Sequence, residues 1–404
     1  MAGDSASSGG ITRRIAVTAI VAAIGGAGVA AAMAGPAPVK EYARALWFMG
    51  APRPAAGGPF AVGRREVALT LPSWGGVTVV LWYPAAASRA GLAERWRRRL
   101  LRPTSAGFSE NAPWAETPRP FPLIVHFPSW FGRETETSFT PAELASHGYV
   151  VATLNDIVHL ERREGVAGRL QAASFDFTSP EAFQASRAPA AQRAELEARF
   201  GQEALEALLA RPETGPHIDA TRIGASGFSF GGAAALELSL LDPRIRAVAN
   251  LDGLVLGQAA RGGVQAPYLF LSADIGPPTP EELAQPDLAV RFDRMLDGEV
   301  LAFQQRQAAQ PDNFTFFIKG TSHLDFTDRL LMPAFAEAFR PSGRDRAEIW
   351  RQINGRLLAF FQRYLAAQPD APGNASVGVQ RLKEISWPDN GAAKAPTMSS
   401  AGAK

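Results

Sequence analysis

The sequence RIGASGFSFGGA at residues 222–233 decides the fold class. A short apolar run is followed by the pattern G-x-S-x-G, centred on Ser229, and then by a run of helical character. A sharp strand-to-helix turn lifts a serine hydroxyl clear of the backbone, and glycines are needed where the turn is tightest. N–H groups at the start of the following helix favour negative charge beside that hydroxyl. The pattern predicts Ser229 as a nucleophile, against the alternative of a tight glycine turn with an incidental serine.

A serine nucleophile of this geometry is followed along the chain by an acid and then by a histidine. Only one of the five histidines, His323, follows Ser229. We expect His323 to be the general base, against the alternative of a structural loop histidine. Asp252 and Asp274 each follow a predicted strand, and position alone does not choose between them as the acid. The other aspartate is expected to cap a turn.

The reaction of such a serine creates an oxyanion that needs two N–H donors. We expect one from the backbone of Phe230, directly after the serine, and the other from Trp130, in the loop after the third strand. Phe131 and Phe228, together with these two aromatic residues, are candidates for the wall of an apolar acyl pocket. The alternative is that the rings belong to the hydrophobic core.

Short apolar runs alternate with helical patterns along the chain, as expected for strands that are buried on both faces of a sheet. A hairpin pair comes first and repeated strand–helix units follow. This order implies one α/β sandwich of about eight strands, mostly parallel, with helices on both faces. The expected strands are 65–71, 77–83, 123–127, 149–154, 222–225, 247–251, 268–272 and 314–318. The expected helices are one opened by a capping box at 140–143, then 191–209, 232–241 and 346–365.

Two connections, 161–216 and 275–311, are longer than this sheet requires. Long connections at one edge of such a sheet tend to be lids or binding loops, and the alternative is surface decoration. We therefore expect a catalytic domain at 55–367 that carries these two lid-like insertions. The remaining segments are an export signal or membrane anchor at 1–34, a linker at 35–54 and a flexible tail at 368–404.

The expected export signal rests on a polar lead, Arg13 and Arg14, and a small-residue apolar run that ends at Ala32-Met33-Ala34. The run is about 20 residues long, which is enough to span a bilayer if it is not cleaved. We expect a periplasmic or secreted protein, anchored to the membrane if the segment is retained. The alternative is an Ala-rich cytoplasmic extension.

Composition excludes several other classes of function. The chain has 41 basic and 39 acidic residues, so its net charge of +2 provides no general surface for nucleic acid. Cysteine is absent, which removes disulfides, thiol catalysis and iron–sulfur clusters. No two histidines have the spacing of a metal site. We expect no metal and no cofactor.

Several of these segments together resemble the plasma-type platelet-activating-factor acetylhydrolase family. They are 122–148, the turn GFSFGG at 227–232, 251–253 and 320–323, with 81–84 before them. The resemblance implies the α/β-hydrolase fold and calcium-independent hydrolysis of short acyl esters, including those at the sn-2 position of phospholipids. Carried over position by position, the roles of nucleophile, base, acid and two oxyanion donors fall on Ser229, His323, Asp252, Phe230 and Trp130.

We therefore expect a serine hydrolase that forms an acyl-enzyme with a small-molecule or lipid ester. One alternative is a cutinase-like polyester or lipid esterase that uses the same residues and prefers longer chains. Another is an inactive hydrolase-fold protein that only binds its ligand, because the Trp130 loop or the second insertion blocks the site.

Overall fold

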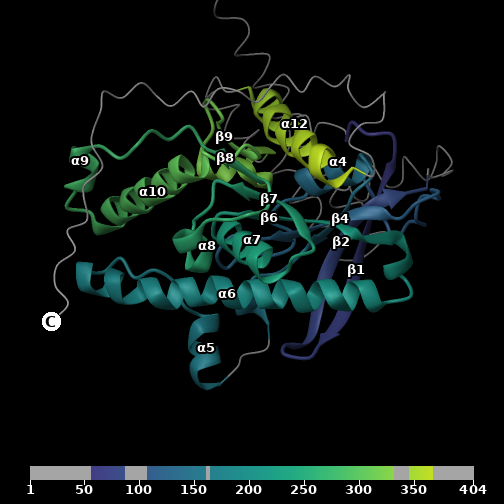
Figure 1. The fold of residues 1–404 in the computed structure, drawn as a ribbon, viewed down its shortest axis with the longest axis horizontal. Coiled ribbons are helices and arrows are strands. Elements are labelled where there is room, and N and C mark those ends of the chain that lie inside the picture. Colours follow the sequence, from purple (N-terminus) through teal and green to yellow (C-terminus); the bar gives the residue numbers. More distant parts are fainter. Residues whose placement is uncertain (1–55, 87–106, 161–163, 332–344, 367–404) are drawn as a thin grey trace, which may run out of the picture.

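The computed structural model describes residues 56–86, 107–160, 164–331 and 345–366 (Figure 1). The expected export segment 1–34, the linker 35–54 and the tail 368–404 lie outside the described residues. The centre of the molecule is a nine-stranded sheet in the order β3-β1-β2-β5-β4-β6-β7-β8-β9. The strands are β1 (Ala61–Leu71), β2 (Gly75–Ala85), β3 (Ser109–Glu110), β4 (Phe121–Phe127), β5 (Val150–Thr153), β6 (Ile218–Phe228), β7 (Ile245–Leu251), β8 (Tyr268–Ser272) and β9 (Asn313–Phe317).

The sheet is antiparallel from β1 through β2 to β5 and parallel elsewhere, including the pairing of β3 with β1. β1 and β2 form a hairpin, and β2 pairs antiparallel with β5. From β5 through β4, β6, β7 and β8 to β9 every pairing is parallel. All eight expected strands are present, and the additional one is β3, two residues that pair with β1. The expected α/β sandwich with a mostly parallel sheet is confirmed.

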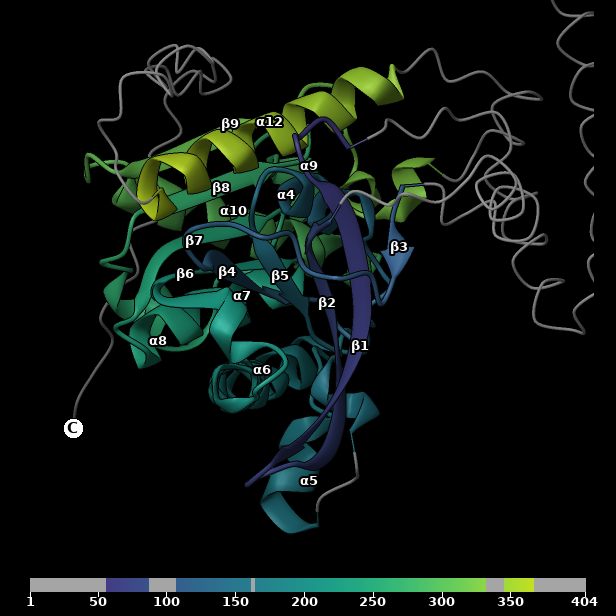
Figure 2. The ribbon, with the colours of Figure 1, turned by 90° about the vertical axis from the view of Figure 1, so that its right-hand side faces the viewer.

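Helices cover both faces of the sheet, as Figure 1 shows and as the turned view of Figure 2 repeats. α6, α7 and α8 lie on one face, and α4 and α12 lie on the other. The helices are α4 (Phe139–Ser146), α5 (Gly165–Gln171), α6 (Pro180–Ala210), α7 (Phe230–Leu241), α8 (Gly257–Gly262), α9 (Pro280–Leu283), α10 (Leu288–Gln307) and α12 (Arg346–Leu365). Within these described ranges, no helix combines the length and the apolar character needed to cross a bilayer.

The core consists of two layers, because successive side chains of a strand point to opposite faces. On β4, Leu123 and Val125 belong to the layer beneath α6 and α7, whereas Ile124 belongs to the layer beneath α4 and α12. All three side chains are at most 1% exposed. The continuous apolar runs of the sequence thus correspond to strands that are buried on both sides.

The start of α4 corrects one expectation. The N-cap residue is Ser138, and Thr140, which was expected to open a capping box, lies inside the helix. The N–H and hydroxyl of Ser138 donate to the carboxylate of Asp328, at 2.7 and 2.6 Å. A distant carboxylate therefore supplies the acceptor that the local sequence pattern was expected to provide.

Helix α6 begins at Pro180, eleven residues before the helix expected at 191–209, and it continues through Pro189 in its interior. Before Pro189 the helix contacts α10. The rings of Phe183 and Phe292 stack with centroids 4.3 Å apart, and Arg187 pairs with Glu299 at 2.6 Å. After Pro189 the helix packs on the sheet, where its buried residues include Ala198 and Leu205. The two long connections thus touch each other through the first half of α6.

Candidate active site

Ser229 occupies the turn between β6 and α7. Its backbone has φ 57° and ψ −123°, a left-handed conformation that is costly for a residue with a side chain. The turn is held by the Ser229 N–H, which donates to the carbonyl of Leu251 at 3.0 Å. A Cβ atom at Gly227 would lie 1.9 Å from the carbonyl oxygen of Gly231, so glycine is required there. The sequence pattern G-x-S-x-G thus has the geometry of a strained strand-to-helix turn.

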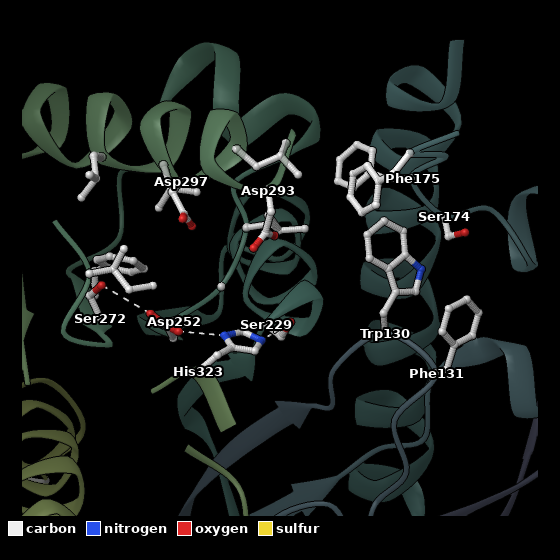
Figure 3. Close-up of a pocket in the computed structure, with 18 residues that line it drawn as sticks. Trp130, Phe131, Ser174, Phe175, Ser229, Asp252, Ser272, Asp293, Asp297 and His323 are labelled. Atoms are coloured by element: carbon white, nitrogen blue, oxygen red, sulfur yellow. Dashed lines mark hydrogen bonds and ion pairs between the residues drawn. The ribbon is translucent and has the colours of Figure 1, made fainter. Parts of the chain in front are cut away.

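The structure brings His323 to Ser229, although 94 residues separate them along the chain (Figure 3). The imidazole Nε2 lies 3.0 Å from the serine Oγ. The other ring nitrogen, Nδ1, lies 2.7 Å from Oδ2 of Asp252. An ionised carboxylate only accepts hydrogen bonds, so Nδ1 carries the proton and Nε2 is left to accept from the serine. This arrangement allows the imidazole to take the serine proton.

Of the two candidate acids, Asp252 contacts the imidazole and Asp274 does not. Oδ1 of Asp252 accepts from the N–H of Ala273 at 2.7 Å, which fixes the carboxylate at the end of β7. Asp274 instead accepts from the N–H of Gly320 at 2.8 Å. Asp274 therefore stabilises the loop that leads to His323, which is the turn-capping role expected for the aspartate that is not the acid.

The surroundings of His323 favour its protonated form. Burial alone lowers the pKa of the imidazole, but the hydrogen bond and charge of Asp252 and the charges of Asp293 and Asp297 together raise it above its ordinary value. The side chain is still 44% exposed, and it lines the cavity. The base is therefore held ready to accept a proton and remains accessible to a ligand.

Asp293 and Asp297 lie on α10, one turn apart, above the imidazole (Figure 3). Burial raises the pKa of both carboxyl groups, and that of Asp297 reaches about 6 despite its hydrogen bond with Arg294. Neither aspartate was expected at the site from the sequence. Two carboxylates at positions i and i+4 of a helix usually face solvent, so only the packing of α10 over the cavity distinguishes them.

The two expected oxyanion donors lie on facing sides of one aromatic stack. The rings of Trp130 and Phe230 are 4.3 Å apart and nearly parallel. Within the described residues, no protein acceptor binds the backbone N–H of either residue. The N–H groups on both sides of Trp130 are engaged, that of Ser129 by Glu136 at 2.7 Å and that of Phe131 by Asp156 at 2.8 Å.

A cavity of about 440 Å³ opens above the serine hydroxyl. Its wall combines an aromatic side from the β4 loop and the segment before α6 with an acidic and aliphatic side from α10. The aromatic side consists of Trp130, Phe131, Phe175 and Phe177. Phe175 and Phe177 were not singled out from the sequence, because they precede the helix expected at 191–209, in a part of the 161–216 connection for which no element was predicted.

Two of the expected pocket residues are not part of this wall. Phe228 is 1% exposed and packs behind the imidazole of His323, with ring centroids 4.7 Å apart. Phe230 is equally buried, beneath Trp130. Both predictions are wrong for the same reason: a residue beside the serine in sequence is directed into the core by the turn. Of the expected aromatic residues, Trp130 and Phe131 line the cavity.

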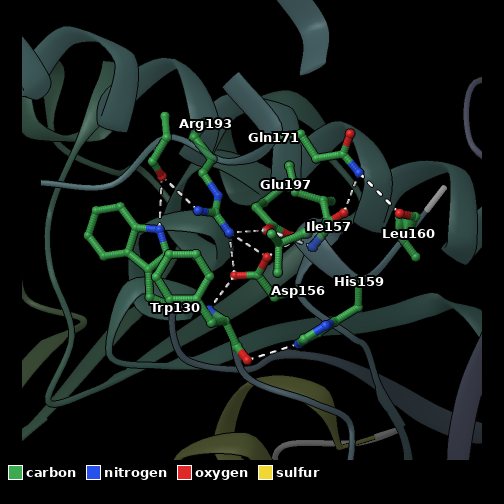
Figure 4. Close-up of polar contacts among 11 residues, drawn as sticks. Trp130, Asp156, Ile157, His159, Leu160, Gln171, Arg193 and Glu197 are labelled. Carbon is green, nitrogen blue, oxygen red and sulfur yellow. Dashed lines mark hydrogen bonds and ion pairs between the residues drawn. The ribbon is translucent and has the colours of Figure 1, made fainter. Parts of the chain in front are cut away.

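A buried ion pair supports the loop that carries Trp130 (Figure 4). Arg193 on α6 has no exposed side-chain surface and hydrogen-bonds both carboxylate oxygens of Asp156. Glu197 lies beside this pair, and burial together with the charge of Asp156 raises its pKa well above the ordinary value. The surroundings of Glu197 therefore favour its neutral form.

No group of three or more potential ligand side chains in the described parts of the chain has the geometry to hold a metal ion. The polar side chains that line the cavity are those of three serines, His323 and three aspartates: Ser174, Ser229, Ser272, Asp252, Asp293 and Asp297. The chemistry that these side chains can perform directly is nucleophilic attack with proton transfer.

Comparisons with known proteins agree with this topology. The model of the dienelactone hydrolase family matches residues 111–288. A solved structure of a ferulic acid esterase from Streptomyces cinnamoneus is similar with a TM-score of 0.52 at 21% identity, over 79% of this chain and 94% of that chain. The fold is that of the α/β-hydrolases. No curated protein sequence matches the chain. Neither match is to the plasma-type acetylhydrolase family, so that finer resemblance remains a prediction.

Proposed function

We propose that the protein is a serine hydrolase of carboxylic esters that acts on short-chain acyl groups. The observation that carries this proposal is the bridge from Asp252 through His323 to the hydroxyl of Ser229, at 2.7 and 3.0 Å, on the floor of an open cavity. The match to the dienelactone hydrolase family and the likeness to a ferulic acid esterase support hydrolysis as the class of reaction.

The geometry supports a two-step reaction through an acyl-enzyme. Ser229 Oγ attacks the ester carbonyl carbon while its proton passes to Nε2 of His323, and Asp252 stabilises the imidazolium through Nδ1–H. The N–H groups of Phe230 and Trp130 stabilise the oxyanion. When the tetrahedral intermediate collapses, the C–O bond breaks and the leaving alkoxide takes the proton from Nε2. Water then attacks the acyl group, transfers a proton to Nε2, and the serine recovers that proton as the acid leaves.

The volume and the lining of the cavity also indicate which esters it can hold. Its volume of about 440 Å³ exceeds what an acetyl or butyryl group fills, so space remains for the alcohol part of the ester. Four aromatic side chains on one wall favour a second candidate, esters of aromatic acids. The ferulic acid esterase with a similar fold agrees with that candidate.

The proposal is tested by Ser229→Ala with p-nitrophenyl acetate and butyrate as substrates. Loss of the nucleophile is expected to reduce kcat by at least about 1,000-fold, because only binding and oxyanion stabilisation remain. Ser239→Ala is a matched control on α7, where the hydroxyl donates to the Leu236 carbonyl at 2.7 Å. Full turnover by the Ser229→Ala protein would show that the proposed nucleophile is wrong.

An ester panel separates the candidates. A preference for C2–C4 acyl groups supports the first, whereas faster turnover of feruloyl or cinnamoyl esters supports the aromatic-ester candidate. High activity on C8–C12 esters or polyesters supports the cutinase-like alternative. A wild-type protein that neither hydrolyses these esters nor reacts with a fluorophosphonate would have only a binding function.

A further inference from the structure

The buried pair of Arg193 and Asp156 has contacts that lead toward the catalytic loop. Both side chains are at most 1% exposed. Removing two charges from water costs free energy that their mutual attraction often fails to recover, so stability alone is a weak reason for such a pair. The residues that contact Arg193 and Asp156 show which segment the pair holds in place.

Asp156 holds the loop after β4 at two points. Its carboxylate accepts the N–H of Phe131 at 2.8 Å, and its own N–H donates to the carbonyl of Gly132 at 3.2 Å. Phe131 has φ 60°, a left-handed conformation that is costly for an aromatic residue. The loop therefore keeps a strained backbone at the point where Asp156 binds it.

Arg193 contacts both residues that we propose as oxyanion donors. It donates to the carbonyl of Ala173 at 2.7 Å, and the indole N–H of Trp130 donates to the same oxygen at 3.0 Å. The guanidinium carbon lies 5.6 Å from the ring centroid of Trp130 and 5.2 Å from that of Phe230. At these distances a cation is attracted by the faces of the rings. One side chain thus links the β4 loop to the first residue of α7.

We propose that Arg193 and Asp156 are positioning residues that hold the Trp130 N–H in place for the oxyanion. This inference rests on the proposed ester hydrolysis. Neither residue lines the cavity, so each acts through the loop and not on the substrate. A donor displaced by about 1 Å loses a large part of its effect on the transition state, whereas substrate binding depends on it much less.

The test is Arg193→Lys. This variant keeps a positive charge beside the buried Asp156, so we expect the protein still to fold. A lysine ammonium cannot reproduce the planar fork that binds Asp156 and Ala173 while it stacks on the rings. We expect kcat per active site, titrated with a fluorophosphonate, to fall by about 10- to 100-fold while KM changes less than about threefold. The affinity for a trifluoromethyl ketone, whose serine adduct carries an oxyanion, should fall by a similar factor.

Asp156→Asn is the second variant, because it removes the charge but keeps the size of the side chain. The matched control is Arg244→Lys, which alters an ion pair with Asp242 at 2.6 Å, outside the cavity. If Arg193→Lys and Asp156→Asn both keep kcat per titrated site and ketone affinity within twofold of wild type, the pair is only structural and the inference is wrong. A wild-type protein that is neither active nor labelled would instead overturn the proposed function, and this inference with it.

Discussion

At the scale of single residues, the site depends on which of two aspartates faces the imidazole. Asp252 and Asp274 follow neighbouring strands, and both carboxylates accept backbone N–H groups. Only Asp252 also contacts His323. The two residues therefore provide a matched pair for separating support of the histidine from support of its loop.

We expect Asp252→Asn to reduce kcat by about 10,000-fold, because the amide no longer enforces the tautomer in which Nε2 accepts the serine proton. Asp274→Asn should leave kcat within about tenfold, since it weakens one hydrogen bond to the His323 loop. Steady-state kinetics on p-nitrophenyl butyrate measure both. Equal losses in the two variants would contradict the assignment of the acid.

At the scale of elements, α10 sets the electrostatic environment of the site. It belongs to the 275–311 connection, for which the sequence predicted only a lid-like insertion. The helix places Asp293 and Asp297 over the imidazole and contributes Leu296 and Val300 to the cavity wall. The acidic pair and the aliphatic wall therefore come from the same helix.

Replacing Asp293 and Asp297 with asparagine should move the acidic limb of the pH–rate profile to lower pH. Burial lowers the pKa of His323, but Asp252 and these two carboxylates raise it, so removing two negative charges lowers it. The neutral imidazole then persists to lower pH, and kcat/KM falls later on acidification. Glu299→Gln, on the same helix and paired with Arg187, is the control. An unchanged limb would show that α10 does not influence the base.

At the scale of the whole molecule, two buried groups oppose each other in the pH dependence of stability. Burial lowers the pKa of His126 from 6.5 to about 4. Burial also raises the pKa of Glu237 from 4.5 to about 7, even though the Ala259 N–H binds its carboxyl group. Between pH 4.5 and 6.5 the unfolded chain binds a proton at His126 that the folded protein lacks, so this group makes stability rise with pH. Glu237 does the reverse, because the folded protein retains a proton that the unfolded chain has lost.

We expect Glu237→Gln to become progressively more stable relative to wild type as the pH rises from 4.5 to 7. The full difference across this window is about 3 kcal/mol, because the pKa of Glu237 rises from 4.5 to about 7 on folding. His126→Asn should show the opposite trend, gaining on wild type as the pH falls from 6.5 to 4. Urea unfolding at several pH values measures both. If the free energy of unfolding changes with pH in the same way in the wild type and both variants, the opposing effects of His126 and Glu237 are contradicted.

The sequence predicted those parts of the fold and of the site that neighbouring residues encode, and it did not predict those that depend on the packing of distant segments. Apolar runs predicted eight strands because each strand is buried on both faces. The serine turn and the residue order predicted Ser229 and His323 but left Asp252 and Asp274 open as the acid, and the family resemblance favoured Asp252. Arg193 and Asp293 could not be predicted in this way. A single charged residue on a helical pattern normally faces solvent, and only the packing of distant segments makes it functional.

Pro189 divides α6 between two parts of the molecule, with a consequence for cooperative unfolding. Proline has no N–H, so the helix lacks one backbone hydrogen bond where its partner changes from α10 to the sheet. The first part of α6 and α10 contact each other through Phe183 and Phe292. These two segments can therefore open without unfolding the part of α6 that packs on the sheet. Amide hydrogens at 180–188 and 288–307 should exchange with deuterium sooner than those at 193–208. The helix that forms the acidic and aliphatic wall of the cavity would then open locally while the sheet remains protected.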